Sequence, residues 1–169
     1  MNKSFACIGL VNPKSPENVG MVMRAAGCYE ASKIFYTGTR FDRARQFYTD
    51  TKNSHEKIPL KNTTDLLATV PEGAKIVAVE LVDGALPLMH FNHPEQAYYI
   101  FGPEDGSLTQ SILDACDYVV YIPTIGCMNL AATVNVVLYD RLAKSVGSVI
   151  EDRPISANRD VNSRAVFKN

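Results

Sequence analysis

The amino-acid sequence predicts an α/β fold with a mainly parallel sheet and helices on both faces. Short segments rich in β-branched and aromatic residues alternate along the chain with segments of helical periodicity. Most of the expected strands are apolar throughout, as strands buried on both faces of a parallel sheet usually are. Several of them end at proline-containing turns.

Strands are expected at residues 5–11, 33–37, 75–81, 97–101 and 118–122, and helices at 19–28, 64–70, 109–116 and 130–144. In the first helix, Val19, Val22 and Ala26 share one face, and Asn18 stands where its side chain can cap the helix. The last helix has a longer apolar face. We find no internal repeat and no low-complexity segment.

Composition places the chain among ordinary globular proteins. Its 169 residues fit one domain, and its hydrophobic content of 46% can supply a core. No apolar run is long enough to span a membrane, and residues 1–7 do not resemble a signal peptide. The 4 cysteines are dispersed along the chain, which favours reduced thiols and a cytoplasmic location.

The sequence contains few candidate metal ligands. It also lacks the net positive charge that would bind nucleic acid tightly. His90 and His93 have no further ligands nearby, so we expect surface histidines and no metal. The net charge is −1, so RNA binding would need a local basic patch, a dimer or a partner. Both common phosphate-binding glycine fingerprints are absent from the sequence.

Three loops at the expected carboxyl ends of strands carry unusual chemistry, namely residues 12–18, 102–109 and 123–129. Ligands of parallel α/β folds bind beyond the carboxyl ends of the strands, so we expect the loops to meet at one site. After the first loop, the free backbone amides at the start of the following helix and the side chain of Arg24 in that helix could bind a phosphate group. The alternative is that Asn18 caps the helix and that Arg24 is simply exposed to solvent.

The other two loops are equally ambiguous when each is considered alone. In the second, two glycines surround Glu104 and Asp105, which suits ribose hydroxyls or a cationic group but also a simple acidic turn. The third is short and apolar, with Cys127 and Asn129 near the long helix. Such a loop can hold an adenine ring, and ordinary loop packing is the alternative.

In this order, the three loops resemble the three motifs of the SpoU/TrmH branch of the SPOUT RNA methyltransferases. The first motif is matched by Asn12-Pro13, Asn18-Val19-Gly20 and Arg24. The second is matched by Phe101-Gly102-Pro103-Glu104-Asp105-Gly106, and the third by Ile122-Pro123, Met128-Asn129-Leu130 and the helix through Tyr139. The resemblance extends over roughly residues 5–144.

The resemblance implies a SpoU/TrmH-like methyltransferase domain with a deep trefoil knot at residues 1–148, followed by a polar C-terminal arm at 149–169. It implies a homodimer that binds S-adenosyl-L-methionine and methylates a ribose 2′-hydroxyl of tRNA or rRNA. Residues expected to hold the cofactor are Leu81, Gly102, Ile122, Cys127, Met128 and Leu130. Residues expected to face the reacting ribose, and so to act in catalysis, are Asn18, Arg24, Glu104 and Asn129.

Two departures from the family pattern lie where cofactor and substrate should meet. Cys127 stands where many members have serine, and the loop that begins at Pro123 is shorter than usual. They motivate two alternatives: a non-catalytic member that binds RNA or cofactor, and a methyltransferase that acts on a base nitrogen.

Residues 40–57 are the expected RNA-binding segment. Its basic side chains include Arg40, Arg43, Arg45 and Lys52. Phe41, Phe47 and Tyr48 lie between them, and aromatic side chains can stack on unpaired bases. A solvated helix face with its aromatic residues turned into the core would give the same pattern.

Overall fold

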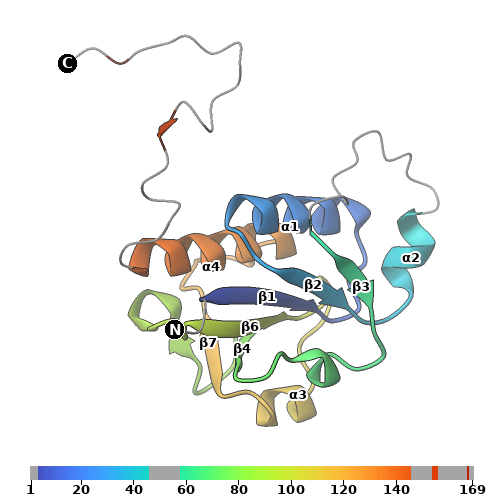
Figure 1. Cartoon of the computed structure of the whole chain (residues 1–169). Helices are drawn as coiled ribbons and strands as arrows, with labels where there is room; N and C mark the ends of the chain where they lie inside the picture. Colours follow the sequence, from blue (N-terminus) through green and yellow to red (C-terminus); the bar gives the residue numbers. More distant parts are fainter. Residues whose placement is uncertain (1–3, 46–57, 146–153, 156–166, 168–169) are drawn as a thin grey trace.

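Seven parallel strands form one sheet between two layers of helices in the computed structural model (Figure 1). The structure describes residues 4–45, 58–145, 154–155 and 167. In chain order the elements are β1 (Phe5–Leu10), α1 (Pro16–Cys28), β2 (Lys33–Tyr36), α2 (Arg40–Arg45), β3 (Leu60–Asn62), the 3₁₀ turn η2 (Leu67–Thr69), β4 (Lys75–Val79), β5 (Leu86–Pro87), the 3₁₀ turn η3 (Leu88–His90), β6 (Gln96–Phe101), α3 (Gln110–Asp114), β7 (Tyr118–Tyr121) and α4 (Leu130–Lys144).

The order of the strands brings the expected loops together at one edge of the sheet. It runs β3-β2-β1-β6-β4-β7-β5, and every pairing is parallel. β1, β6, β4 and β7 are therefore consecutive neighbours, and the loops that follow them leave the sheet on the same side. The predicted mainly parallel α/β fold is confirmed.

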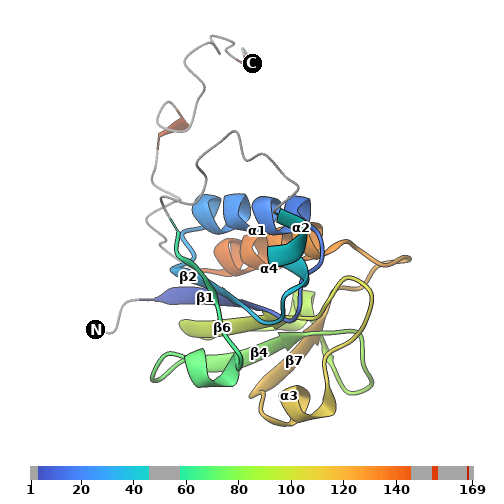
Figure 2. The same ribbon diagram turned by 90° about the vertical axis from the view of Figure 1, so that its right-hand side faces the viewer.

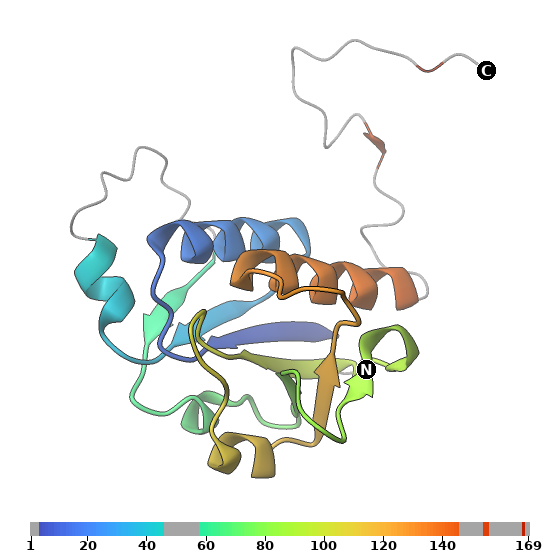
Figure 3. The ribbon, with the colours of Figure 1, turned by 180° about the vertical axis from the view of Figure 1, so that it is seen from behind.

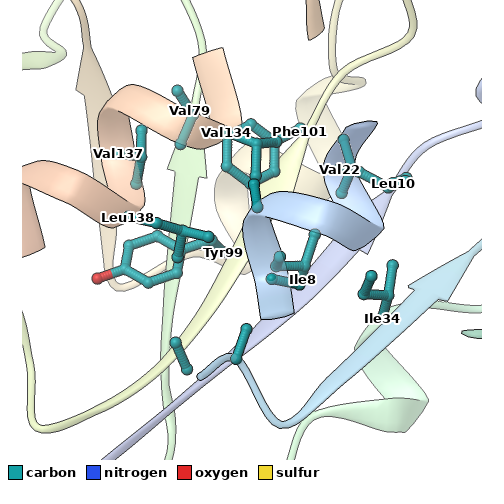
Figure 4. Close-up of a cluster of buried hydrophobic side chains, with 14 of the residues drawn as sticks. Ile8, Leu10, Val22, Ile34, Val79, Tyr99, Phe101, Val134, Val137 and Leu138 are labelled. Atoms are coloured by element: carbon teal, nitrogen blue, oxygen red, sulfur yellow. The ribbon is translucent and has the colours of Figure 1, made fainter. Parts of the chain in front are cut away.

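Helices cover both faces of the sheet, as predicted. α1 and α4 pack against each other on one face, and α3 and η2 lie on the other (Figure 2). Along β6, Tyr99 and Phe101 enter the core beneath α1 and α4, while Tyr98 and Ile100 enter the core on the opposite face. Figure 4 shows the first core, in which side chains of α1 and α4 meet those of the central strands. Strands buried on both faces explain the continuous apolar segments in the sequence.

Gly9 of β1 is a position where the packing requires glycine. A Cβ atom there would lie 2.8 Å from Cε1 of Tyr98, whose ring is fully buried beside it. The hydroxyl of Tyr98 is also fixed, since it lies 2.8 Å from Oγ1 of Thr69. The small residue in β1 thus admits a large aromatic side chain from β6.

Two sequence predictions about helices are wrong. α1 begins at Pro16, and its cap is Ser15, whose Oγ accepts from the Asn18 amide at 3.2 Å. Asn18 therefore lies inside the helix, because proline suits the first helical position and extends the helix towards the N-terminus. Residues 64–70 contain only the turn η2: Asp65 accepts from the Leu67 amide at 2.9 Å at its start, and Pro71 disfavours a helical conformation of Val70 at its end.

Several short elements were not expected, namely β3, β5 and η3, and α2 corresponds to the helix considered as the alternative for residues 40–57. The expected C-terminal arm lies mostly outside the described residues, so the division at residue 148 stays a prediction. No helix in the described part of the chain is long and apolar enough to cross a membrane.

The prediction of surface histidines is wrong for His93, whose side chain is only 4% exposed. Its ring lies 2.6 Å from the Tyr99 hydroxyl through Nδ1 and 2.8 Å from the Asp140 carboxylate through Nε2. A neutral ring that donates to Asp140 and accepts from Tyr99 satisfies both bonds. Burial lowers the pKa of His93, the Asp140 hydrogen bond opposes this, and the charges of Arg141 and Lys144 add to the lowering.

The same network fastens the end of α4 to the amino-terminal edge of the sheet. Arg141 donates to the carbonyl oxygens of Pro94, Phe5 and Glu95 at 2.5, 3.2 and 2.6 Å. Lys144 donates to Asp140 at 2.7 Å and to the Leu88 carbonyl at 2.6 Å. These bonds explain how a partly buried polar cluster can lie beside an apolar core.

We predict that His93 makes stability depend on pH. Since its pKa is lower in the folded state than the ordinary 6.5, its contribution is complete above pH 6.5 and is lost as the pH falls towards the folded value. His93→Gln should lower the free energy of unfolding at pH 7.5 by about 1–3 kcal/mol, because the Tyr99 and Asp140 bonds are disturbed. It should also flatten the pH dependence between pH 7 and 5, measured by urea unfolding.

His90→Gln is the matched control, because His90 is exposed at the end of η3. Equal pH profiles for the two variants would contradict the assignment to His93.

Candidate active site

A cavity of about 740 Å³ lies at the carboxyl edge of the sheet. Its wall is built from the loops that follow β4, β6 and β7 and from the start of α4. Figure 3 shows the chain passing from β7 through the third loop to α4. The volume is typical of a small-molecule site. All residues expected to hold the cofactor line this cavity, namely Leu81, Gly102, Ile122, Cys127, Met128 and Leu130.

Apolar side chains stand at the cavity with little protein around them. Leu81 is 74% exposed, and Ile125 of the third loop is fully exposed. The third loop is braced by a hydrogen bond of 2.6 Å from the Thr124 hydroxyl to the Gly126 carbonyl. Exposed apolar groups around a ligand-sized cavity gain free energy when an apolar ligand covers them.

Glu80 is a cavity residue that the sequence prediction missed. Its Oε2 accepts from the Leu108 amide at 2.8 Å, and its Oε1 accepts from the Leu81 amide at 3.0 Å, so it joins the loops after β4 and β6. A Cβ atom on Gly102 would lie 3.2 Å from Oε2 of Glu80, so glycine leaves room for this carboxylate. The expected strand ran to residue 81, whereas β4 ends at Val79. An acidic residue directly after a buried strand was the available signal.

Glu104 joins the second loop to the first. Its carboxylate accepts from the amides of Lys14 and Ser15 at 2.9 and 3.1 Å and from Nδ2 of Asn18 at 3.2 Å. Partial burial alone would raise the pKa of Glu104, but the hydrogen bonds from Ser15, Lys14 and Asn18 outweigh it and lower the pKa. The structure therefore brings two predicted catalytic residues, Asn18 and Glu104, into contact beside the cavity.

Asn129 lies between two residues that line the cavity, Met128 and Leu130. Its Oδ1 caps α4 by accepting from the Ala132 amide at 2.7 Å. Within the described residues its Nδ2 has no partner. Asn129 thus has a structural role and keeps a hydrogen-bond donor for a ligand.

Arg24 lies apart from the other predicted catalytic residues. It is exposed on α1, on a stripe with Gly20 and Met21, and it does not line the cavity. Within the described ranges it makes no hydrogen bond or ion pair. A single chain therefore assembles Asn18, Glu104 and Asn129 near the cavity and leaves Arg24 outside it.

The predicted RNA-binding arginines belong to α2. Arg40 forms a bidentate pair with Asp105, at 2.8 and 2.7 Å. Arg45 lies 3.7 Å from the Asp42 carboxylate, and Arg43 is exposed. Phe41 is buried, so for this residue the alternative of an aromatic side chain turned into the core is confirmed. Lys52, Phe47 and Tyr48 lie outside the described residues.

No metal centre is evident in the part of the chain that the structure describes. It contains no group of three or more His, Cys, Asp or Glu side chains placed to hold a metal ion. The cavity and its loops thus define an α/β protein with a small-molecule site at the carboxyl edge of its sheet.

Comparison with known proteins identifies the family. The model of the SpoU rRNA Methylase family matches residues 6–139, and the chain belongs to this family of RNA methyltransferases. No curated protein sequence matches the chain.

Solved structures show the same fold. The TrmH/SpoU tRNA modifying enzyme of A. aeolicus is 16% identical, with 84% of this chain and 76% of that chain covered and a TM-score of 0.71. An AdoMet-bound rRNA methyltransferase from Sinorhizobium meliloti is 21% identical, with 86% and 59% covered and a TM-score of 0.70. A structure described as giving insight into 2-OH methylation of C/U34 on tRNA is 21% identical, with 85% and 92% covered and a TM-score of 0.67.

This likeness confirms the predicted fold class, including the SPOUT-type α/β knot. The chain spans about three-fifths of the length of the Sinorhizobium protein.

We predict that Glu104→Gln loosens the joined loops. The carboxylate faces three donors, so in either orientation the glutamine amide would point an NH₂ group at one of them. The free energy of unfolding should fall by about 1–3 kcal/mol at pH 7 in urea titrations. The exposed Glu72→Gln serves as control, and identical midpoints for both variants would show that the bridge is not stabilising.

Proposed function

We propose that this protein transfers a methyl group from S-adenosyl-L-methionine to a ribose 2′-hydroxyl of tRNA or rRNA. The second and third family motifs line one cavity of about 740 Å³, and Glu104 joins the first motif to its edge through Lys14, Ser15 and Asn18; this arrangement carries the proposal. The bound AdoMet of the Sinorhizobium neighbour supports the cofactor. The neighbour described for C/U34 of tRNA, whose chain is 92% covered, supports a 2′-hydroxyl acceptor and favours tRNA.

The residues of the cavity fit this cofactor. Leu81, Ile122 and Met128 supply apolar surface for an adenine ring, and the carboxylate of Glu80 adds negative charge to the wall. Negative potential favours a sulfonium cation. When bound, S-adenosyl-L-methionine supplies an electrophilic methyl group.

In this proposal polar residues orient the acceptor ribose and stabilise the charge that develops on its oxygen. Asn18, Glu104 and Asn129 orient the ribose, and correct positioning alone can supply up to about 7–11 kcal/mol of a barrier in favourable cases. The family resemblance assigns removal of the hydroxyl proton to Arg24. A guanidinium stays protonated in proteins, so a clamp on phosphate and on the developing oxyanion is the physically easier role.

We further propose a homodimer, because Arg24 cannot act from outside the cavity. The exposed sides of the two packed helices α1 and α4 carry Met21, Val136 and Tyr139, which are 46%, 36% and 60% exposed. Gly20 lies beside them on α1 with open space around it, so another backbone can approach closely. A second copy seated on this face would cover the apolar side chains and bring its Arg24 towards a neighbouring site.

We predict that Arg24→Lys nearly abolishes turnover while cofactor binding survives, because a point charge cannot replace a guanidinium fork. Incubation with labelled S-adenosyl-L-methionine and size-sorted total RNA, followed by nuclease digestion, measures the transfer. Calorimetry with S-adenosylhomocysteine measures cofactor binding.

The position of the label separates the alternatives. Label on ribose supports the proposal, label on a base indicates a base-nitrogen methyltransferase, and no label indicates a non-catalytic member. Normal turnover of Arg24→Lys would remove Arg24 from the mechanism.

We predict that Met21→Glu or Tyr139→Glu converts the dimer to monomers, since each buries a charge in the proposed interface. Light scattering after size-exclusion chromatography measures the mass, and methylation should be lost while S-adenosylhomocysteine still binds. Met89→Glu is the control, because Met89 is 58% exposed on η3 and is not one of the residues of the proposed interface. A wild-type protein that is monomeric and active at the same concentration would contradict the dimer.

A further inference from the structure

We propose that Lys14 and Arg40 form a binding site for one phosphodiester group of the RNA, and that Asp105 occupies this site in the free protein. The inference rests on the proposed RNA substrate and adds to it a specific contact beside the cavity. It also gives Asp105 a function, as an internal competitor of the RNA backbone.

Two cations from different parts of the chain converge on one carboxylate oxygen. Nη2 of Arg40 lies 2.7 Å from Oδ2 of Asp105, and Nζ of Lys14 lies 3.8 Å from the same oxygen. Nη1 of Arg40 also donates to Oδ1 at 2.8 Å, which completes a bidentate pair. The guanidinium of Arg40 therefore already presents the fork that a phosphate group accepts in the same way.

The site is open enough for exchange. The side chains of Lys14, Arg40 and Asp105 are 65%, 29% and 53% exposed. Ion pairs in such surroundings contribute little to stability, so a phosphodiester can replace the carboxylate without great loss. The hydrogen bond from Arg40 lowers the pKa of Asp105, and the competing carboxylate is in any case ionised at neutral pH.

The site lies next to the proposed catalytic residues. Asp105 stands between Glu104 and Gly106, and both of these residues line the cavity. Lys14 is joined to Glu104 through its backbone amide at 2.9 Å. A phosphate held by Lys14 and Arg40 would therefore place the RNA backbone at the edge of the cavity.

Competition by Asp105 explains how a chain with a net charge of −1 can restrict RNA binding to suitable partners. An incoming anion must displace the Asp105 carboxylate before it can pair with Lys14 and Arg40. A nucleic acid that makes no other contact at the site gains little from this exchange, whereas an RNA seated by its reacting nucleotide gains one more anchored phosphate.

Filter binding of end-labelled total tRNA at several salt concentrations tests the site. Arg40→Ala should weaken binding and make the slope of log K against log salt shallower by about 0.7–0.9, the amount expected for one lost phosphate contact. Asp105→Asn should tighten binding about twofold to fivefold, because the competitor is removed. Asp105→Asn should tighten binding less in the Arg40→Ala background than in the wild type, since Asp105 acts chiefly through its bidentate pair with Arg40 and only the more distant Lys14 remains.

Matched controls separate the site from bulk charge. Asp114→Asn raises the net charge as Asp105→Asn does, but Asp114 bonds only to Gln110 on α3 among the described residues. Lys75→Ala removes a cation from the Lys75–Asp117 pair, which lies at the amino ends of β4 and β7. If each variant of the site matched its control in RNA affinity, the pair would be only a brace for the loop and the proposal would be overturned.

Two further readouts keep this test independent of the methyltransferase assignment. Binding of S-adenosylhomocysteine, measured by calorimetry, should be retained in Arg40→Ala and Asp105→Asn. If instead Arg40→Ala lost the cofactor and kept its RNA affinity, Arg40 would serve the cofactor and the phosphate site would be wrong. RNA binding that follows the expected pattern without any methyl transfer would retain the site and refute the proposed reaction.

Discussion

The parallel pairing of β1 with β6 is the constraint on which the candidate site depends. The two strands are in register from Phe5 opposite Gln96 to Leu10 opposite Phe101. The Val11 amide extends this ladder by donating to the Phe101 carbonyl at 3.0 Å. Two segments far apart in the sequence therefore leave the sheet side by side, and Glu104 then joins them through three hydrogen bonds. Without this register, the carboxylate would have no donors to accept from.

The sequence predicted the main strands and the cavity wall because both follow from simple physical rules. Strands buried on two faces are apolar throughout, and loops at their carboxyl ends carry the ligand-binding residues. β3 and β5 escaped prediction because they are too short for periodicity to appear. Glu80 was missed because a boundary error of two residues placed it inside a strand. Such an error matters most at strand ends, where the site begins.

The structure also shows why local sequence misjudged some side chains. Nothing near His93 in the sequence indicates burial, because its partners Tyr99 and Asp140 come from β6 and α4. Likewise, Asn18 resembles a helix cap, yet it donates to Glu104 from within the first turn of α1. Polar side chains with several possible partners depend on tertiary contacts, whereas apolar periodicity does not. Arg24 presents the same difficulty, because it lies on an exposed helix face. In the proposed dimer its contacts would come from a second chain.

The two edges of the sheet have different roles: the amino edge contributes to stability, and the carboxyl edge carries the candidate binding site. At the amino edge, Arg141 and Lys144 saturate backbone carbonyls and fasten α4 to β1 and to the segments before β6. At the carboxyl edge, the loops are held by a few carboxylates, chiefly Glu80 and Glu104, and the groups between them stay open. A rigid amino edge allows the opposite loops to keep unsatisfied donors and exposed apolar groups, because the fold does not depend on them. A ligand can then supply the missing contacts without disturbing the core.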